Sequence, residues 1–282
     1  MFGADPGFAT LRIRPRQVLV VVGLLGLCGF VGGCREGGTA GVPMPRKIID
    51  LSPPITEDIA VRQFGHRACE FLGLPERFQF TPLVPANPDY TFGLTRFELV
   101  SHLGSHIDAP GRLVKDGARV DQISLSKLFG PAQVLDLRWK DRQTELQVTD
   151  LENYNSQIGK NEVLILYVGY TQPKDEDWPA YPPLSVEAAQ WLADKGIKAL
   201  ATDMPSIGSF SRYADLMDKG RPPAEVWAER LAFVDKGKDI PVVEGLTNLS
   251  KLLTEENIVF AGFPLPIADA SGAPIRAAAL IY

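Results

Sequence analysis

The stretch Glu-Val-Leu-Ile-Leu-Tyr-Val at residues 162–168 carries the strongest strand pattern in this chain. It is apolar almost throughout, which is typical of a strand buried on both faces of a sheet. Residues 185–195 then predict a helix, because Ser185 is a suitable N-cap and Gly196 a suitable terminator. Residues 197–203 return as a strand. This succession of strand, helix and strand predicts α/β architecture.

Shorter runs on either side extend the pattern. Residues 92–100 alternate apolar and polar side chains, which predicts a strand that leads into the segment 101–112. Further strands are predicted at 47–52, 132–137, 240–244, 258–263 and 277–282, and helices near 61–72 and at 222–236 and 248–256, within a chain that is otherwise irregular over 55–90. No internal repeat and no linker follow residue 46, so we predict one domain at 47–282.

The composition is that of an ordinary globular protein. The chain has 282 residues, of which 45% are hydrophobic and 22% are charged, and a domain of this size can bury a stable core. The formal net charge is −5 at pH 7 and the sequence pI is about 5.4. Nucleic-acid-binding domains are typically strongly basic, so no nucleic-acid partner is predicted.

The first 33 residues have the organisation of an export signal. Arg12, Arg14 and Arg16 form a basic region, and residues 18–30 are an apolar run of thirteen. A transmembrane helix is the alternative, but it needs about 20 apolar residues to span a bilayer. A basic region, then a short apolar run, then small residues is the order of a secretory signal.

The end of this leader resembles the bacterial lipobox, in which a cysteine is lipidated and becomes the first mature residue. The resembling residues are Val-Gly-Gly-Cys at 31–34, and the alternative is an ordinary signal with a chance cysteine. Residues 35–45 are rich in Gly and Pro, as a flexible tether would be. We therefore predict a lipoprotein signal at 1–33, a tether at 34–46, and anchoring through Cys34 on the periplasmic or cell-surface side of a bacterial membrane. Cys69 would then be the single remaining cysteine, so no internal disulfide is expected.

The segment Ser-His-Leu-Gly-Ser-His-Ile-Asp-Ala-Pro-Gly-Arg at 101–112 carries the clearest chemistry. His102 and His106 are two of only three histidines in the chain, and Asp108 follows closely. Two imidazoles and a carboxylate are a suitable ligand set for a divalent metal. The alternative is a pair of unrelated histidines in a loop.

The backbone must bend for these side chains to meet. In a fully extended strand the Cα atoms of His102 and His106 would be about 13 Å apart, too far for comfortable binding of one ion. Gly104 and Pro110 disfavour a helix. A bent or bulged strand end remains, with Gly104 at the bend.

The same segment resembles the signature of the cyclase family of metal-dependent hydrolases, which includes bacterial kynurenine formamidase and isatin hydrolase. That signature runs His-x-Gly-Thr-His-x-Asp-x-Pro-x-His, and residues 102–112 here read HLGSHIDAPGR. The resemblance continues in the family's order at 117–123 (GARVDQI), 184–189 (LSVEAA), 203–207 (DMPSI) and 243–249 (VEGLTNL). It therefore spans roughly residues 47–282.

This resemblance implies a swivelling β/α/β domain with a mixed sheet, assembled as a homodimer or homotetramer. It implies one or two divalent ions, Zn²⁺ or Mn²⁺. His102, His106 and Asp108 match ligands of the first ion, Asp108 bridges to a second ion in two-metal members, and Glu244 matches a ligand of that second ion. The implied reaction is hydrolysis of an amide or cyclic amide, in which the metal activates water and polarises the scissile carbonyl.

Three positions depart from the family pattern. The last signature histidine, which moves protons in the family, falls on Arg112; arginine stays protonated and cannot act as a general base, although it could stabilise an oxyanion or hold a substrate carboxylate. The histidine expected before Glu244 falls on or near Glu229, whose carboxylate would shift the preference from zinc toward manganese or magnesium. The family's usual Thr-Gly-Trp reads Val-Gly-Tyr at 168–170, which changes a pocket wall.

Further candidate site residues lie outside the signature segment. Asp203, Ser206 and Tyr170 are predicted on the substrate side. Asp203 ends a strand at a loop, where functional groups often lie in α/β folds, and a turn cap is the alternative for it. His66 is a candidate replacement for the missing proton carrier, with an ordinary surface or loop histidine as the alternative.

Two functions follow from these observations. The first is an anchored hydrolase of amide or cyclic amide carbon–nitrogen bonds in a small molecule, similar to arylformamidase and isatin hydrolase. The second is a non-catalytic lipoprotein of the same fold that binds a small molecule or a metal, because Arg112 replaces the proton-shuttling histidine.

Overall fold

The apolar run at 162–168 lies in the middle of the main sheet. In the computed structural model, which describes residues 43–84, 93–171, 178–235 and 237–282, it forms strand β6 (Val163–Tyr167). β6 pairs in parallel with β5 (Phe129–Asp136) and β7 (Ala199–Thr202), and β7 pairs in parallel with β8 (Val242–Glu244). Antiparallel partners complete the sheet: β4 (His106–Asp108), β10 (Gly272–Ile281), β1 (Lys47–Asp50) and β9 (Ile258–Pro264). The predicted α/β fold with a mixed sheet is confirmed.

Strand β10 closes this sheet on itself. Its residues 272–274 pair with β4, and its residues 275–281 pair with β9, which also borders β5. Each face of the sheet buries an apolar cluster, since side chains alternate along a strand. Val163 of β6 belongs to one cluster, whereas its neighbour Leu164 belongs to the other.

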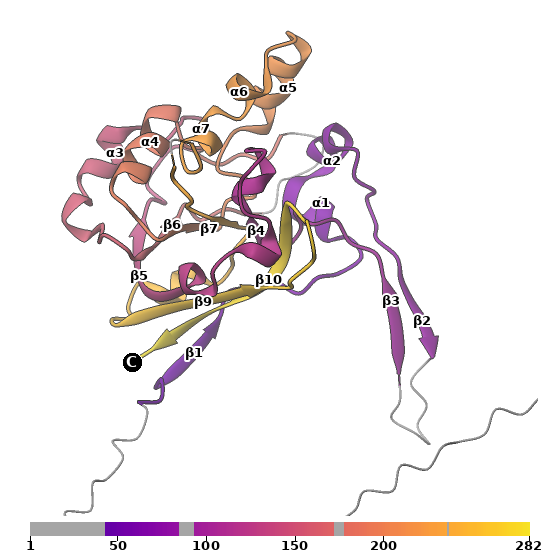
Figure 1. Cartoon of the computed structure of the whole chain (residues 1–282), viewed down its shortest axis with the longest axis horizontal. Helices are drawn as coiled ribbons and strands as arrows, with labels where there is room; N and C mark the ends of the chain where they lie inside the picture. The colour runs from indigo at the N-terminus through magenta and orange to yellow at the C-terminus, as the bar shows by residue number, and fades with distance from the viewer. Residues whose placement is uncertain (1–42, 85–92, 172–177, 236) are drawn as a thin grey trace, which may run out of the picture. The chain divides into compact units, whose positions relative to one another are not determined.

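Helices pack against the face that carries Leu164. Helix α4 (Val186–Asp194) begins at Ser185, whose Oγ accepts a hydrogen bond from the Ala188 N–H, so this N-cap prediction is confirmed. In Figure 1, α3 and α4 lie together beside the sheet. The other helices are α1 (Ile59–Phe64), α2 (His66–Leu72), α3 (Val148–Glu152), α5 (Phe210–Asp218), α6 (Pro223–Val226) and α7 (Ala228–Leu231). Short 3₁₀ turns lie at Pro110–Arg112, Val120–Gln122, Leu125–Leu128, Asn155–Gln157 and Leu249–Leu252.

Several segments differ from their predictions, among them the helix predicted at 222–236, which is present only as the short helices α6 and α7. The strand predicted at 92–100 is β3 (Leu94–Phe97), which pairs with β2 (Phe80–Val84) in a separate two-stranded sheet. Leu94 and Phe97 are exposed there, so the alternation of apolar residues does not correspond to a buried face. The helix predicted at 248–256 is only a 3₁₀ turn, and α5 was not predicted, although Ser209 caps it through the Arg212 N–H.

The predicted signal and the lipidation residue Cys34 lie outside the described residues. Among the residues that the structure describes, no helix is long and apolar enough to cross a membrane. Residues 43–282 form one compact unit, and all of the site described below belongs to it.

Candidate metal and substrate site

Strands β4 and β8 place three functional side chains on one face of the sheet. They pair antiparallel, with His106 opposite Glu244 and Asp108 opposite Val242. Because side chains alternate along a strand, His106 and Asp108 project from the same face, whereas Ile107 enters the apolar cluster on the other. His106, Asp108 and Glu244 are all buried, so an imidazole and two carboxylates are gathered away from bulk water.

Gly104 turns the chain so that His102 reaches the same place. Its φ is 66°, in the left-handed region that glycine adopts readily. The buried side chain of Gln63 holds this turn: Oε1 accepts from the Gly104 N–H (2.7 Å) and Nε2 donates to the Gly104 carbonyl (3.2 Å). The ring centroids of His102 and His106 are 5.4 Å apart. The bend predicted at Gly104 is present, and it precedes β4 rather than forming a bulge within it.

We expect Gly104→Ala to lower the free energy of unfolding by about 1–2 kcal/mol, the cost of a left-handed conformation for a residue with a Cβ atom. The nearest atom to an added Cβ is Ile55 Cγ1 at 3.5 Å, an ordinary contact, so backbone strain sets the cost. Gly104→Asn should lose less, because asparagine adopts this conformation more easily. Urea unfolding measures both variants, and equal losses would contradict the explanation by strain.

Hydrogen bonds determine which nitrogen of each histidine is unprotonated. His106 Nδ1 lies 2.9 Å from the Gly104 carbonyl oxygen, an acceptor, so Nδ1 carries the proton and Nε2 the lone pair. His102 Nδ1 accepts from Arg112 Nη1 (3.2 Å), and His102 Nε2 donates to Ser271 Oγ (3.1 Å). The two unprotonated nitrogens therefore are His102 Nδ1 and His106 Nε2.

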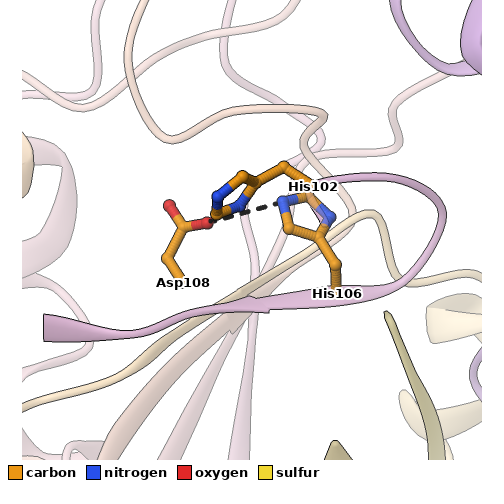
Figure 2. A group of neighbouring side chains, drawn as sticks. All are labelled: His102, His106 and Asp108. Carbon is orange, nitrogen blue, oxygen red and sulfur yellow. Dashed lines mark ion pairs between the residues drawn. The ribbon is translucent and has the colours of Figure 1, made fainter. Parts of the chain in front are cut away.

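Both of these nitrogens lie beside Asp108 (Figure 2). Asp108 Oδ1 is 2.7 Å from His102 Nδ1 and 3.6 Å from His106 Nε2, yet it is buried and has no hydrogen-bond partner among the described residues. Burial lowers the pKa of His102, against Asp108, which raises it, so the ring is neutral and carries a single proton. The assignment of that proton to Nε2 rests on Arg112, which can only donate to Nδ1. One ligand atom from each of the three residues lies within 4.8 Å of the others. These lone pairs fit a divalent cation.

Two guanidinium groups contact the other oxygen of Asp108. Asp108 Oδ2 accepts from Arg112 Nη1 (2.5 Å) and from Arg230 Nη1. Arg230 also donates from Nη2 to Glu244 Oε1 (2.7 Å) and to Ser206 Oγ (2.8 Å). Burial alone would raise the pKa of Asp108, but Arg112 and Arg230 hold it well below its usual range. Two arginines therefore balance the charge of the two carboxylates.

Glu229, predicted at or near the second-ion position, points elsewhere. Its Oε1 accepts from the Tyr213 hydroxyl and its Oε2 from Arg212 Nη1 (2.9 Å). Consecutive residues of a helix differ by about 100° in direction, so Glu229 and Arg230 of α7 have different neighbours. The structure therefore does not bring Glu229 together with His102, His106 and Asp108, and a cation, Arg230, lies between the site carboxylates instead.

A pocket adjoins these groups. Its polar lining comprises His102, His106, Arg112, Ser206, Arg230 and Glu244, and its apolar and aromatic lining comprises Phe64, Leu72, Leu74, Val100, Pro205, Phe210, Tyr213 and Trp227. Apolar walls with a few polar groups are typical of small-molecule sites. The Arg112 side chain is 25% exposed and that of Arg230 only 5%, so Arg112 is the cation that a ligand would meet first.

Of the three predicted substrate-side residues, Ser206 lines this pocket, whereas Tyr170 and Asp203 line a different one. The Tyr170 hydroxyl donates to the Gln63 carbonyl (2.6 Å). The Asp203 carboxylate accepts from the backbone N–H groups of Val168 (2.9 Å) and Tyr170 (2.7 Å). Asp203 therefore caps the turn after β6, the alternative considered for it above.

Burial raises the pKa of Asp203 to about 6, against backbone hydrogen bonds that lower it, from an ordinary value of 3.8. The stability that this raised pKa contributes is present below pH 3.8 and is lost as the pH rises through about 6. The loss corresponds to about 3 kcal/mol from this group. We expect the wild type to lose stability relative to Asp203→Asn over this window. Urea unfolding measures the difference, and a difference constant with pH would contradict it.

His66 lies apart from the pocket. It begins helix α2, its side chain is half exposed, and its Nδ1 is 2.9 Å from Glu76 Oε1. It is absent from the lining of the pocket beside Asp108. The structure therefore does not bring His66 to this pocket, and its position agrees with the alternative of an ordinary surface or loop histidine.

The sequence did not identify Arg230, Gln63 or Ser271 as site residues. For Arg230 the one available signal was its position beside Glu229, because the family's histidine was placed on or near that residue. Gln63 precedes Gly104 by 41 residues, and Ser271 follows His102 by 169. Neither belongs to a local motif, so only the fold brings them to the site.

The chain is similar to known proteins in both sequence and fold. A family model described as "Putative cyclase" matches residues 49–209. A kynurenine formamidase from Geobacillus thermodenitrificans is 28% identical over 180 residues, which are 63% of this chain and 75% of the relative. An isatin hydrolase crystal structure with the product analogue thioisatinate superposes with a TM-score of 0.65 at 20% identity, over 83% of this chain and 92% of that one. A structure described as a potential metal-dependent hydrolase with cyclase activity gives 0.57 at 21% identity, over 83% and 96%.

Proposed function

The chain belongs to the cyclase family, and we propose that it is a metal-dependent hydrolase of the carbon–nitrogen bond in an amide or cyclic amide. The observation that carries the proposal is the buried, unpartnered Asp108 Oδ1 beside two unprotonated histidine nitrogens. The kynurenine formamidase relatives and the isatin hydrolase fold support this substrate class. Oxygen and nitrogen ligands of this kind suit Zn²⁺ or Mn²⁺.

His102, His106 and Asp108 are the residues that would hold the ion. A divalent cation bound by them supplies an activated water and polarises the scissile carbonyl. Around it, the apolar walls of the pocket bind the substrate's hydrocarbon part and exclude bulk water.

Glu244 is placed to move the proton. Its Oε1 is held by Arg230 and by the Ile207 N–H (2.7 Å), whereas its Oε2 lies 3.4 Å from His106 Nε2, and the residue lines the pocket. Oε2 takes a proton from the attacking water, whose hydroxyl adds to the carbonyl carbon. The carbon–nitrogen bond then breaks, and Oε2 returns the proton to the departing nitrogen.

Arg112 has a different task from the family's histidine. It stays protonated, and its guanidinium lies at the pocket beside His102 and Asp108. There it stabilises negative charge that develops on the substrate oxygen.

The test uses the purified full chain, stripped of metal and reloaded with Zn²⁺ or Mn²⁺ separately. A panel of N-formyl aryl amides and lactams is assayed with the wild type, His102→Ala and the surface control His66→Ala. We expect turnover by the wild type and by His66→Ala only. The proposal fails if metal-loaded wild type hydrolyses nothing while His102→Ala leaves ligand binding unchanged.

That failure would favour the second function, a non-catalytic protein that binds a small molecule or a metal. One observation supports it. Arg112 donates to His102 Nδ1 and to Asp108 at once, so it competes for a nitrogen that the metal needs.

Substitution of Arg112 by the family's histidine tests whether Arg112 is what makes the site inactive. If Arg112 disables an otherwise intact site, Arg112→His should raise kcat on formyl amides by at least about tenfold, because a neutral imidazole transfers protons near pH 7, an effect worth about 10²–10⁴-fold. Arg230 still pairs with Asp108 in this variant. Arg112→Lys keeps a cation without a proton carrier and should show no gain. Absence of a gain in metal-loaded Arg112→His would contradict the view that Arg112 disables an otherwise intact site, and it would agree with the role of Arg112 beside the substrate oxygen.

The lipid anchor and the assembly are proposals of their own. The lipobox-like residues 31–34 support export and lipidation at Cys34. Labelled palmitate supplied to bacteria that express the chain should enter the wild type and not Cys34→Ala. The homodimer or homotetramer implied by the family is measured by light scattering of the purified protein.

A further inference from the structure

Arg230 links the two carboxylates of the site. Its Nη1 donates to Asp108 Oδ2, and its Nη2 donates to Glu244 Oε1 (2.7 Å). We propose that the Arg230 guanidinium is a built-in cation that takes the place of a second metal ion, so that the protein binds one divalent cation per chain. This inference rests on the proposed metal site, but it does not require that the protein hydrolyse amides.

The carboxylate oxygens divide into two groups. Asp108 Oδ1 faces the unprotonated histidine nitrogens and has no hydrogen-bond partner among the described residues. Asp108 Oδ2 and Glu244 Oε1 both accept hydrogen bonds from Arg230, and each has one further donor, Arg112 Nη1 (2.5 Å) and the Ile207 N–H (2.7 Å). Asp108 Oδ1 therefore has free lone pairs for one ion. A second ion shared by the two carboxylates would need Asp108 Oδ2 and Glu244 Oε1, which already accept hydrogen bonds.

The charge of Arg230 makes this occupation permanent. Arginine is not deprotonated in proteins, so it cannot lose its charge to admit a cation, as a histidine or lysine can. The side chain is 5% exposed and also donates to Ser206 Oγ (2.8 Å). Arg230 Nε has no partner in the described part of the chain, so its two Nη atoms, which span the carboxylates, account for its hydrogen bonding.

This arrangement gives Arg230 a positioning role. With Oε1 of Glu244 held by the guanidinium, Oε2 remains on the pocket side, 3.4 Å from His106 Nε2. A second metal ion would have used this carboxylate as a ligand. The arginine instead leaves one of its oxygens available for proton transfer.

The experiment counts metal ions. The full chain is stripped with a chelator, equilibrated with excess Mn²⁺ and passed through gel filtration, and the metal content is measured by mass spectrometry against protein concentration. Electron paramagnetic resonance gives an independent readout, because one isolated Mn²⁺ and an exchange-coupled pair have different spectra. We expect one ion per wild-type chain and the spectrum of an isolated ion.

Substitutions at Arg230 sharpen the count. Arg230→His removes the fixed charge and offers a ligand beside Asp108 and Glu244, so the content should rise twofold, with the spectrum of a coupled pair. Arg230→Lys keeps a cation and should stay at one ion. A folded Arg230→His that still binds one ion overturns the inference. If this variant does not fold, the wild-type count decides, because two ions with Arg230 intact would overturn it equally.

These outcomes are distinct from those of the proposed function. A wild type that binds one Mn²⁺ and hydrolyses no amide contradicts the hydrolase and supports the role of Arg230. A wild type that binds two ions and hydrolyses amides supports the hydrolase and contradicts the role of Arg230. Failure to bind any ion contradicts both.

Discussion

Metal binding, and with it the proposed amide hydrolysis, is expected to disappear in His106→Ala. His106 is buried, its Nδ1–H is held by the Gly104 carbonyl, and its Nε2 faces Asp108 Oδ1 and Glu244 Oε2. Loss of this nitrogen leaves His102 and Asp108, and Arg112 competes for both. Two contested ligands do not retain an ion in a site that normally has three protein ligands.

The size of this loss is judged against two graded controls. Ser271 Oγ lies 3.1 Å from His102 Nε2 and is not one of the three residues that would hold the ion, so Ser271→Ala should lower metal affinity or activity by about 10–100-fold. His66→Ala should change neither. Calorimetric titration with Zn²⁺ and the hydrolysis assay give both quantities, and circular dichroism checks the fold. A His106→Ala protein that binds zinc as tightly as Ser271→Ala does would contradict the assignment of His106 as a metal ligand.

Local pattern was sufficient where a single element decides the outcome. The continuous apolar run of β6 predicted a strand buried on both faces, and Val163 and Leu164 do enter opposite clusters. Alternation then fixes the direction of His106 and Asp108 once β4 is known, because residues two apart share a face. The glycine between the histidines predicted the bend, and its φ of 66° is the conformation that a bend requires.

Local pattern was insufficient where direction depends on an element too short to have a period. Helix α7 has four residues, little more than one turn, so its sequence does not show which face meets β8. An error of one residue turns the side chain by about 100° and exchanges Arg230 for Glu229. That exchange converts a predicted metal ligand into the cation that opposes a second metal.

The exposure of apolar side chains on β3 was also not predictable from the local sequence. Alternating apolar residues predict that one face is covered, and the covering element lies elsewhere in the chain. Here β3 pairs only with β2 among the described strands, Phe80 contacts Phe97 edge to face at 6.2 Å between ring centroids, and Phe97 remains exposed. The alternating pattern therefore predicts the strand correctly, but it does not predict which element covers the apolar side chains.

Removal of the Arg230 guanidinium is expected to destabilise the metal-free protein by about 3–5 kcal/mol, the usual cost of breaking a buried ion pair from one side. Arg230→Met preserves much of the side chain's apolar stem but leaves Glu244 Oε1 with only the Ile207 N–H, and Asp108 Oδ2 with only Arg112. Burial raises the pKa of Asp108, and the loss of Arg230 removes one of the two charges that hold it down, so this pKa rises in the variant. The difference from the wild type should therefore shrink as the pH falls and Asp108 becomes neutral.

Arg276→Met is the matched control, because Arg276 pairs with Asp50 at 2.8 Å through a side chain that is 83% exposed. An exposed pair contributes about 0–1 kcal/mol, so the two variants should differ severalfold in urea unfolding at neutral pH. Added Mn²⁺ should stabilise Arg230→Met more than it stabilises the wild type, since the ion replaces a missing positive charge beside Asp108. Equal destabilisation by the two substitutions would mean that the buried carboxylates do not depend on Arg230, and it would contradict the bridging role on which the count of one ion rests.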